Sequence, residues 1–284
     1  MNAIDSVLDG LIDYAGLYPP ASQDMRSTVR NYLSYRNGEH ATTLGRLIVD
    51  LNRLDELYEA AGNSLGDLRL SVIVSPHADL DSLQRLRNDG FPIEMIEAKA
   101  AHAAEIERIS QCVPDGVTIY IEVPVQSDAT NLLDAISAAG VRAKLRLGGI
   151  VADAFPTTQA IAHMLKALAR RGIPFKATAG LHHPIRSRRA LTYEPGSPVG
   201  TMHGFFNLCC AAVLLHFGGE AREAKILLDE QDAAAWQVTA DEIGWRSFRW
   251  SADQLRVVRQ QFFISFGSCS FKEPIDDLEA LGWL

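Results

Sequence analysis

The chain has 284 residues, of which 47 % are hydrophobic and 22 % are charged. This composition is typical of a globular protein and excludes a disordered, collagen-like or coiled-coil chain. The formal net charge of −8, from 27 basic and 35 acidic side chains, argues against strong nonspecific binding to nucleic acid or to an anionic membrane. We therefore expect neither nucleic acid nor membrane among its partners.

Cysteine usage and the N-terminal segment indicate a cytoplasmic location. The four cysteines, at positions 112, 209, 210 and 269, have no metal-binding spacing and are expected to be reduced thiols. The first 16 residues contain three aspartates and no basic residue, which is unlike a signal peptide. The most apolar stretch, residues 205–217, is too short to span a bilayer and predicts a buried helix.

Short apolar runs alternate with amphipathic stretches along the chain. The runs that predict strands are 11–16, 46–50, 68–75, 93–99, 118–124, 142–149, 173–180 and 262–267. The stretches that predict helices are 25–36, 51–61, 80–89, 100–111, 131–139, 157–171 and 274–281. Successive starts from the second to the seventh strand are about 22 to 31 residues apart, the length of one strand, one helix and two loops. This pattern predicts a (β/α)8 TIM-type barrel that spans residues 1–284 as one domain. An open doubly wound sheet has a similar local pattern and is the alternative, but the chain carries no glycine-rich nucleotide-binding motif.

A long insertion separates the seventh and eighth predicted strands. It covers residues 181–261 and contains an expected apolar helix over 201–217 and a further acidic helical stretch through Ile243. Insertions of this length on a compact barrel usually serve as lids or as interfaces. Two interpretations therefore stay open, a lid over the site and a surface that joins copies of the chain into a homo-oligomer.

Charged and polar side chains gather near the carboxyl ends of the predicted strands, where barrel enzymes place their active sites. They are Glu97, Lys99, Glu122, Lys144, Arg146, Lys176 and Thr178, followed by Ser268 and Cys269 after the last strand. Alternate residues of a strand share a face, so an inward orientation would bring two carboxylates and four cations together. Since buried lysine and glutamate are rare unless paired, this group predicts an active site.

Lys176 is the sharpest catalytic candidate. It lies between two apolar residues, and that burial together with the cations Lys144 and Arg146 would favour its neutral amine. A neutral amine can attack a carbonyl to form a Schiff base, with Glu122 as general acid and base if its pKa rises. In two alternatives Lys176 is a substrate-binding cation, or it forms an ion pair with Glu97 or Glu122.

Two segments could bind an anion. Arg146, followed by glycines at 148 and 149, suits a carboxylate or phosphate, because guanidinium can donate two hydrogen bonds and glycine allows close backbone approach. Ser268 and Cys269 lie before the last predicted helix in a loop that resembles the phosphate-binding loops of barrels. Acidic residues in the first turn of that helix would compete with an anion. Cys269 is also a candidate reactive thiol, although the sequence shows no base beside it.

Histidines follow the seventh predicted strand and recur in the insertion. We expect His182 and His183 to serve as acid–base or substrate-binding groups. His203 and Asn207, which lie on one face of the expected insertion helix, are expected to bind substrate. Together with a strand carboxylate these histidines could hold a divalent metal, but their spacing matches no common metal motif. No cofactor is predicted, and a divalent metal is the alternative.

Two stretches carry a resemblance to known proteins. AKLRLGG at 143–149 and FKATAGLHHP at 175–184 resemble segments of uncharacterised bacterial β/α-barrel proteins, as does FGSCSF at 266–271. That resemblance implies the barrel fold and no particular activity. The KATAG segment at 176–180 is also similar to the strand-lysine motif of Schiff-base aldolases of the deoxyribose-phosphate type. This second resemblance implies a Schiff-base role for Lys176.

The leading functional prediction is an enzyme that acts on a small anionic carbonyl compound by lyase (aldol-type) or isomerase chemistry. Lys176 would form the Schiff base or act electrostatically, Glu122 would transfer protons, and Lys144 and Arg146 would hold the anionic group. One alternative is a divalent-metal-dependent hydrolase or lyase. The other is a non-catalytic barrel that binds a metabolite or a partner through residues 181–261.

Overall fold

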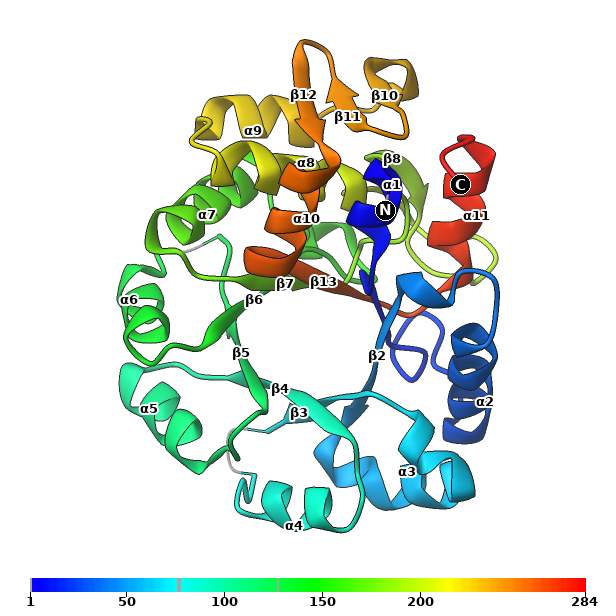
Figure 1. The fold of residues 1–284 in the computed structure, drawn as a ribbon, viewed down its shortest axis with the longest axis vertical. Coiled ribbons are helices and arrows are strands. Elements are labelled where there is room, and N and C mark those ends of the chain that lie inside the picture. Colours follow the sequence, from blue (N-terminus) through cyan, green and yellow to red (C-terminus); the bar gives the residue numbers. More distant parts are fainter. Residues whose placement is uncertain (1, 76–77, 127) are drawn as a thin grey trace.

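The computed structural model describes residues 2–75, 78–126 and 128–284. Eight parallel strands close into a barrel in the order β1-β13-β7-β6-β5-β4-β3-β2, surrounded by helices (Figure 1). The strands are β1 (Ile12–Tyr14), β2 (Leu44–Asp50), β3 (Leu70–Val74), β4 (Ile93–Lys99), β5 (Thr118–Val123), β6 (Arg142–Arg146), β7 (Phe175–Thr178) and β13 (Phe263–Ser268). The predicted (β/α)8 barrel is therefore confirmed, and each of the eight predicted strands corresponds to one strand of the barrel.

The surrounding helices also follow the prediction. They are α2 (Met25–Arg36), α3 (Leu54–Ala61), α4 (Ser82–Asn88), α5 (Ala103–Cys112), α6 (Thr130–Ala138), α7 (Thr158–Arg171) and α11 (Lys272–Ala280). Short 3-10 turns lie at Ala41–Thr43, Leu51–Arg53, Gly62–Asp67, Ala152–Ala154 and Ala233–Ala235.

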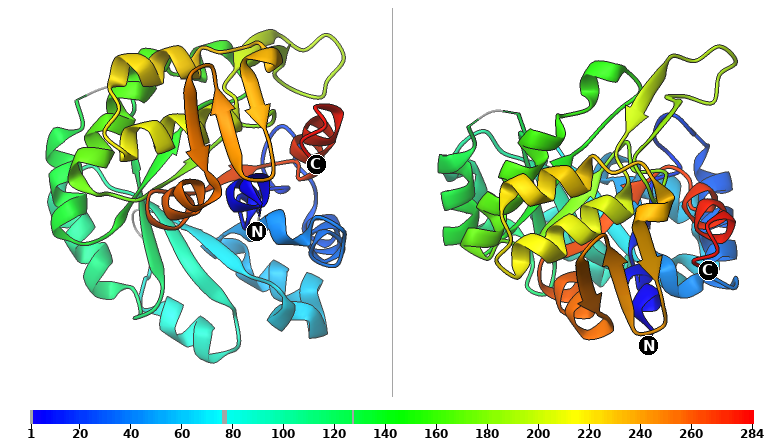
Figure 2. Two further views of the ribbon diagram at one scale, coloured as in Figure 1. Left: turned by 45° about the horizontal axis from the view of Figure 1, so that its top comes forward. Right: turned by 90° about the horizontal axis from the view of Figure 1, so that it is seen from above.

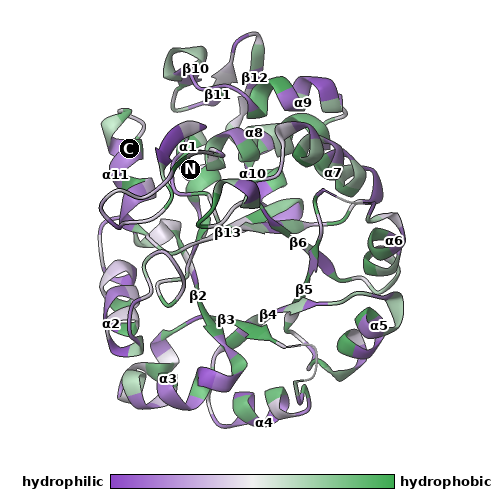
Figure 3. Cartoon of the chain, turned by 180° about the vertical axis from the view of Figure 1, so that it is seen from behind, coloured by the Kyte–Doolittle hydropathy of each residue, from purple (hydrophilic) through white to green (hydrophobic). Residues whose placement is uncertain are grey.

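Helix α7 shows why these segments are helical. Its start is capped by Thr157, whose side chain accepts a hydrogen bond from the N–H of Ala160, and it ends at Gly172 in the left-handed conformation. Its buried residues include Ile161, Leu165 and Leu168, which recur at helical spacing and form one apolar face. Figure 3 shows the same division in the surrounding helices, which carry both hydrophobic and hydrophilic residues.

The insertion between β7 and β13 contains more strand than the sequence predicted. It comprises a hairpin of β8 (Ser187–Ala190) and β9 (Val199–Met202), helices α8 (Phe205–His216) and α9 (Ala221–Leu228), an antiparallel sheet of β10 (Trp236–Val238), β11 (Glu242–Trp245) and β12 (Phe248–Ser251), and helix α10 (Ala252–Gln261). The expected apolar helix exists, and every residue from Phe205 to Leu215 is buried. It begins at Phe205 and not at residue 201, because residues 199–202 form β9, so His203 lies before the helix and does not share a helical face with Asn207.

The predicted acidic helical stretch through Ile243 is wrong beyond α9. The chain there forms β10 and β11, because large apolar side chains alternate with polar ones at the period of a strand. Trp236 pairs with Trp245 across β10 and β11, and Ile243 pairs with Trp250 across β11 and β12. All four side chains are buried, and their cross-strand packing stabilises a sheet in a segment that was predicted to be helical.

The two ends of the barrel are covered differently. Helix α1 (Ala3–Leu8), which the sequence analysis did not predict, lies at one end, and the β8–β9 hairpin projects from the other (Figure 2). Near α1 the buried guanidinium of Arg259 donates to the backbone carbonyls of Val7 and Asp9 and ties α10 to the N-terminal segment. In the part of the chain that the structure describes, no helix is both long enough and apolar enough to cross a membrane.

Candidate active site

Five charged side chains from five different strands meet inside the barrel. Asp13 of β1, Glu97 of β4, Glu122 of β5, Lys144 of β6 and Lys176 of β7 form what we call the charge network. The side chains of Asp13, Glu97 and Lys176 are fully buried, and those of Lys144 and Glu122 are 7 % and 14 % exposed. Moving so many charges out of water costs several kcal/mol per ion before pairing, so stability alone does not account for the network.

Lys176 is enclosed at the bottom of the charge network. Its Nζ lies 2.6 Å from Asp13 Oδ2 and 2.6 Å from Glu97 Oε1. Burial lowers the pKa of Lys176, but the two carboxylates outweigh burial and raise it above the usual range of lysine. The structure therefore holds Lys176 as an ammonium in an ion pair with Glu97, which is one of the alternatives considered from the sequence.

Lys144 occupies the upper part of the charge network. Its Nζ lies 2.9 Å from Glu97 Oε2 and 3.0 Å from Glu122 Oε2. Burial lowers the pKa of Lys144 and raises those of Glu97 and Glu122, and in each case the opposite charges outweigh burial. The pKa of Lys144 is therefore raised and those of both carboxyl groups are lowered, so all three groups are charged at neutral pH.

Several polar contacts fix the orientation of the buried carboxylates. Ser71 Oγ donates to Glu97 Oε1 at 2.8 Å, and Ser265 Oγ donates to Asp13 Oδ2 at 2.7 Å. The backbone N–H of Arg46 donates to the other oxygen of Asp13 at 2.7 Å. The sequence analysis missed Asp13, Ser71 and Ser265, although each is a polar residue within an apolar strand run.

A cavity of about 320 Å³ opens above the charge network, at the carboxyl ends of the strands. We call it the mouth cavity. Its polar and ionisable lining side chains are Tyr18, Glu97, Lys144, Arg146, Thr178, His182 and Cys269, and Leu191 and Met202 of the insertion also line it. A cavity of this volume accommodates a small molecule, and Lys144 is the cation of the charge network that lines it.

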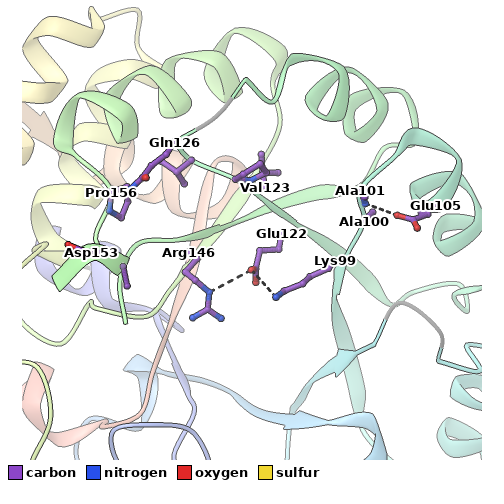
Figure 4. A pocket seen from close by; sticks show the side chains of 13 residues that line it. Lys99, Ala100, Ala101, Glu105, Glu122, Val123, Gln126, Arg146, Asp153 and Pro156 are labelled. Carbon is purple, nitrogen blue, oxygen red and sulfur yellow. Dashed lines mark hydrogen bonds and ion pairs between the residues drawn. The ribbon is translucent and has the colours of Figure 1, made fainter. Parts of the chain in front are cut away.

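A second hollow, of about 640 Å³, lies beside the mouth cavity over the ends of β4, β5 and β6. There Arg146 Nε lies 3.6 Å and Lys99 Nζ 3.7 Å from Glu122 Oε1, and both cations point toward that carboxylate (Figure 4). The side chains of Lys99 and Arg146 are 69 % and 52 % exposed. Arg146 lines both spaces and is therefore available to an anion that enters from solvent.

His182 and Cys269 meet at the edge of the mouth cavity. The Nε2 atom of His182 lies 3.8 Å from Cys269 Sγ, and its Nδ1 lies 2.8 Å from Glu273 Oε2. Burial lowers the pKa of His182, but Cys269 and Glu273 outweigh burial and raise it to about 9. The sequence analysis proposed both residues for the site but could not see that Cys269 has a base beside it.

Ser268 is the last residue of β13 and not part of the predicted loop, and the segment after it uses its own N–H groups. The N–H of Ser270 bonds to Ser268 Oγ at 3.3 Å, and the N–H of Glu273 bonds to Ser270 Oγ at 3.1 Å. Two donors that the predicted phosphate loop would offer to an anion are therefore bound within the loop.

The glycines after β6 have two different surroundings. A Cβ atom on Gly148 would lie 2.8 Å from the Cα of Gly180 and 2.6 Å from the ring of Phe155, so Gly148 permits close packing between the segments after β6 and β7. Gly149 lines the mouth cavity. A Cβ atom on Gly149 would lie 2.9 Å from the Cβ of Ala154, so both glycines make room for neighbouring parts of the chain, and Gly149 also borders the cavity.

The remaining histidine after β7, His183, contacts helix α11. Its Nδ1 lies 2.7 Å from Asp277 Oδ2, and it is absent from the lining of either space described above.

The carboxylates considered as metal ligands, Glu97 and Glu122, are paired with lysines. Within residues 2–75, 78–126 and 128–284, no three or more histidine, cysteine or carboxylate side chains gather as metal ligands would.

His203 and Asn207 hold the insertion together. His203 Nε2 donates to the carbonyl of Pro156 at 2.9 Å, and its Nδ1 accepts from Arg186 at 2.9 Å. Burial and the Arg186 charge lower the pKa of His203 to about 4, so it is neutral. The buried amide of Asn207 accepts from the N–H of Arg186 and donates to two backbone carbonyls at and after the end of α9. The structure therefore places neither residue in the mouth cavity.

The sequence was compared with models of known protein families and with curated proteins. No family model matches the chain, and no curated protein is significantly similar to it.

Proposed function

We propose that the protein is an enzyme that binds a small anionic carbonyl compound in the mouth cavity and acts on it by isomerase or aldol-type lyase chemistry. The observation that carries the proposal is the placement of Lys144, a buried ammonium that lines a cavity of molecular size next to Arg146 and His182. An ammonium in this position supplies fixed positive charge where water is largely excluded.

Lys144 acts as the electrostatic catalyst in this proposal. Both reaction types develop negative charge on a carbonyl oxygen, either when a proton leaves the adjacent carbon or when the adjacent carbon–carbon bond breaks. A lysine ammonium that donates to this oxygen stabilises the enolate more than the neutral carbonyl. Glu97 and Glu122 keep Lys144 charged and fix its direction.

Lys176 takes a positioning role rather than the role of a Schiff-base nucleophile. An ammonium that contacts two carboxylates at 2.6 Å has no free electron pair with which to attack a carbonyl. Its contact with Glu97 Oε1 instead holds the carboxylate that contacts Lys144 through Oε2. Residues 176–180 resemble the aldolase lysine motif, but in this proposal Lys176 positions Glu97 and does not react with the substrate.

Proton transfer falls to His182 and, from the adjoining second hollow, to Glu122. Burial raises the pKa of Glu122, but Lys144 outweighs burial and lowers it, contrary to the rise that the sequence-based role required, so Glu122 is an ionised but weak proton acceptor. His182 lines the cavity and carries a proton at neutral pH, so it can donate to a developing oxyanion or carbanion. Arg146 holds the acidic group of the compound, and the lining residues Leu191 and Met202 support the interpretation of the insertion as a lid.

The proposal can be tested before the substrate is identified. Two- to five-carbon keto acids and phosphorylated ketones and aldehydes, each paired with the corresponding alcohol, are screened for a rise in melting temperature. Carbonyl compounds that bind are then incubated in D2O, and exchange of the proton next to the carbonyl is followed by NMR. We expect at least one anionic carbonyl compound to bind better than its alcohol and to undergo catalysed exchange.

Variants tie the result to the cavity. Lys144→Met should slow exchange by about 100-fold or more, and Arg146→Gln should weaken binding by about 10-fold or more. Arg222→Gln, which removes an exposed arginine on α9, is the matched control and should change neither. Absence of binding and exchange for every compound, or exchange that survives Lys144→Met, would reject the proposal.

A further inference from the structure

Cys269 lies beside the mouth cavity directly after β13. The residue is 5 % exposed and lines the cavity together with His182. The other cysteines lie elsewhere, Cys209 and Cys210 inside the buried helix α8 and Cys112 at the end of α5. Cys269 is therefore the thiol that a ligand in the mouth cavity would meet.

His182 connects this thiol to a carboxylate. Its Nε2 lies 3.8 Å from Cys269 Sγ and its Nδ1 lies 2.8 Å from Glu273 Oε2. A carboxylate at Nδ1 favours a ring proton on Nδ1, so Nε2 is the atom that takes the proton of the thiol, and the charged ring described above is the form that His182 has once it has taken this proton. Thiol, imidazole and carboxylate thus stand in the order that activates a sulfur nucleophile.

Tyr193, in the segment between β8 and β9, completes this arrangement. Its hydroxyl donates to Glu273 Oε2 at 2.8 Å and lies 3.7 Å from Cys269 Sγ. Oε2 of Glu273 therefore receives hydrogen bonds from both the imidazole and the phenol. The long insertion contributes directly to the surroundings of the thiol.

We infer that Cys269 is a nucleophile, with His182 as its general base and Glu273 as the residue that positions His182. Its target is the electrophilic carbonyl carbon of the anionic compound that Lys144 and Arg146 hold in the same cavity. The identity of the target rests on the proposed function, whereas activation of the thiol by His182 does not.

The covalent step needs no further reactant. A bond forms between Sγ and the carbonyl carbon while the carbonyl π bond breaks and its electron pair moves to oxygen. The thiol proton passes to His182 Nε2 and from there to that oxygen, which gives a thiohemiacetal. The reverse sequence releases the compound unchanged and restores the carbonyl that enolate formation requires, so the adduct is a reversible resting form of the bound compound.

Alkylation by iodoacetate and by iodoacetamide tests this inference, because both form the same sulfur–carbon bond and differ in charge. The native protein is treated with each reagent, and the rate at each cysteine is measured by peptide mass spectrometry. Cys112, which is partly exposed, is the control within the same molecule. We expect iodoacetate to alkylate Cys269 about 10-fold faster than Cys112. The ratio of the iodoacetate rate to the iodoacetamide rate should also be higher at Cys269 than at Cys112.

Two variants test the base. His182→Gln should slow alkylation of Cys269 by about 100-fold, and Glu273→Gln by about 10-fold, while the rate at Cys112 is unchanged. Alkylation of Cys269 no faster than that of Cys112 would overturn the inference, and so would a rate unaffected by both substitutions. The measurement on the unmodified chain decides the matter even if a variant fails to fold.

The outcomes also separate this inference from the proposed function. A slow reaction at Cys269 in a protein that still catalyses deuterium exchange rejects the nucleophile and leaves the proposed function standing. A fast, His182-dependent reaction without preference for iodoacetate supports the activated thiol and contradicts an anionic target.

Discussion

Lys144 and Lys176 are register partners on the neighbouring strands β6 and β7, and their ammonium groups share the carboxylate of Glu97. Lys144 contacts Oε2 and lines the mouth cavity, whereas Lys176 contacts Oε1 and reaches across to Asp13. Two lysines that look equivalent in the sequence thus have different access to a ligand. The division of roles between them is the basis of the proposed chemistry.

Removal of the Lys176 charge should destabilise the fold strongly. Lys176→Met leaves Asp13 and Glu97 buried without their shared cation, and we expect the free energy of unfolding to fall by about 3–5 kcal/mol. Lys99→Met removes a lysine whose side chain is 69 % exposed and should cost about 1 kcal/mol or less. Denaturant unfolding of both variants checks this, and equal losses would show that the buried ion pairs are not structural.

The ring of His182 should titrate far above that of His203. Contacts with Cys269 and Glu273 raise the pKa of His182 to about 9 against the effect of burial, whereas burial and then Arg186 lower that of His203 to about 4. NMR of ring-labelled histidines should therefore show His182 charged and His203 neutral at pH 7. Ordinary titration of both rings near pH 6.5 would contradict the contacts described.

These shifts give opposite dependences of stability on pH. The folded-state pKa of His182 lies above the ordinary value of 6.5, so its contribution to stability is complete below about pH 6.5 and is lost as pH rises through about 9. The pKa of His203 is lowered, so the fold loses stability as pH falls below about 6.5 toward 4. Comparison of unfolding free energies of the unmodified chain and His182→Gln at pH 6 and pH 10 should show the larger difference at pH 6. A difference that does not change with pH would contradict the assignment.

Asn207 should be a structural residue. Asn207→Ala leaves the N–H of Arg186 and the carbonyls of Leu227 and Glu230 without their partner, and we expect a loss of about 2–4 kcal/mol in unfolding free energy. Asn37→Ala removes an exposed amide that bonds one carbonyl of its own helix and should cost about 0.5 kcal/mol. Denaturant unfolding of both variants checks this. If Asn207→Ala lowers the free energy of unfolding no more than Asn37→Ala does, the buried hydrogen bonds of Asn207 do not stabilise the fold.

The sequence predicted the barrel because strands and helices repeat at regular spacing, and it predicted the strand-end charges because a strand of known direction places its polar terminal residues at one rim. How deeply each charged side chain lies inside the barrel could not be predicted in the same way. Whether Lys144 or Lys176 lines the cavity depends on which carboxylates each lysine reaches across the barrel, and Asp13 was missed because a lone aspartate in a three-residue strand gives little signal. The contact of Cys269 with His182 joins residues 87 positions apart, so only the folded chain places the base beside the thiol.

The most direct test of the central claim is the crystal structure of the protein soaked with pyruvate, a small anionic carbonyl compound. Our account predicts pyruvate in the mouth cavity, with its carbonyl oxygen within about 3 Å of Lys144 Nζ and its carboxylate on Arg146. Pyruvate bound outside this cavity, or joined to Lys176 Nζ as an imine, would contradict the assignment of Lys144 as the lysine that meets the substrate.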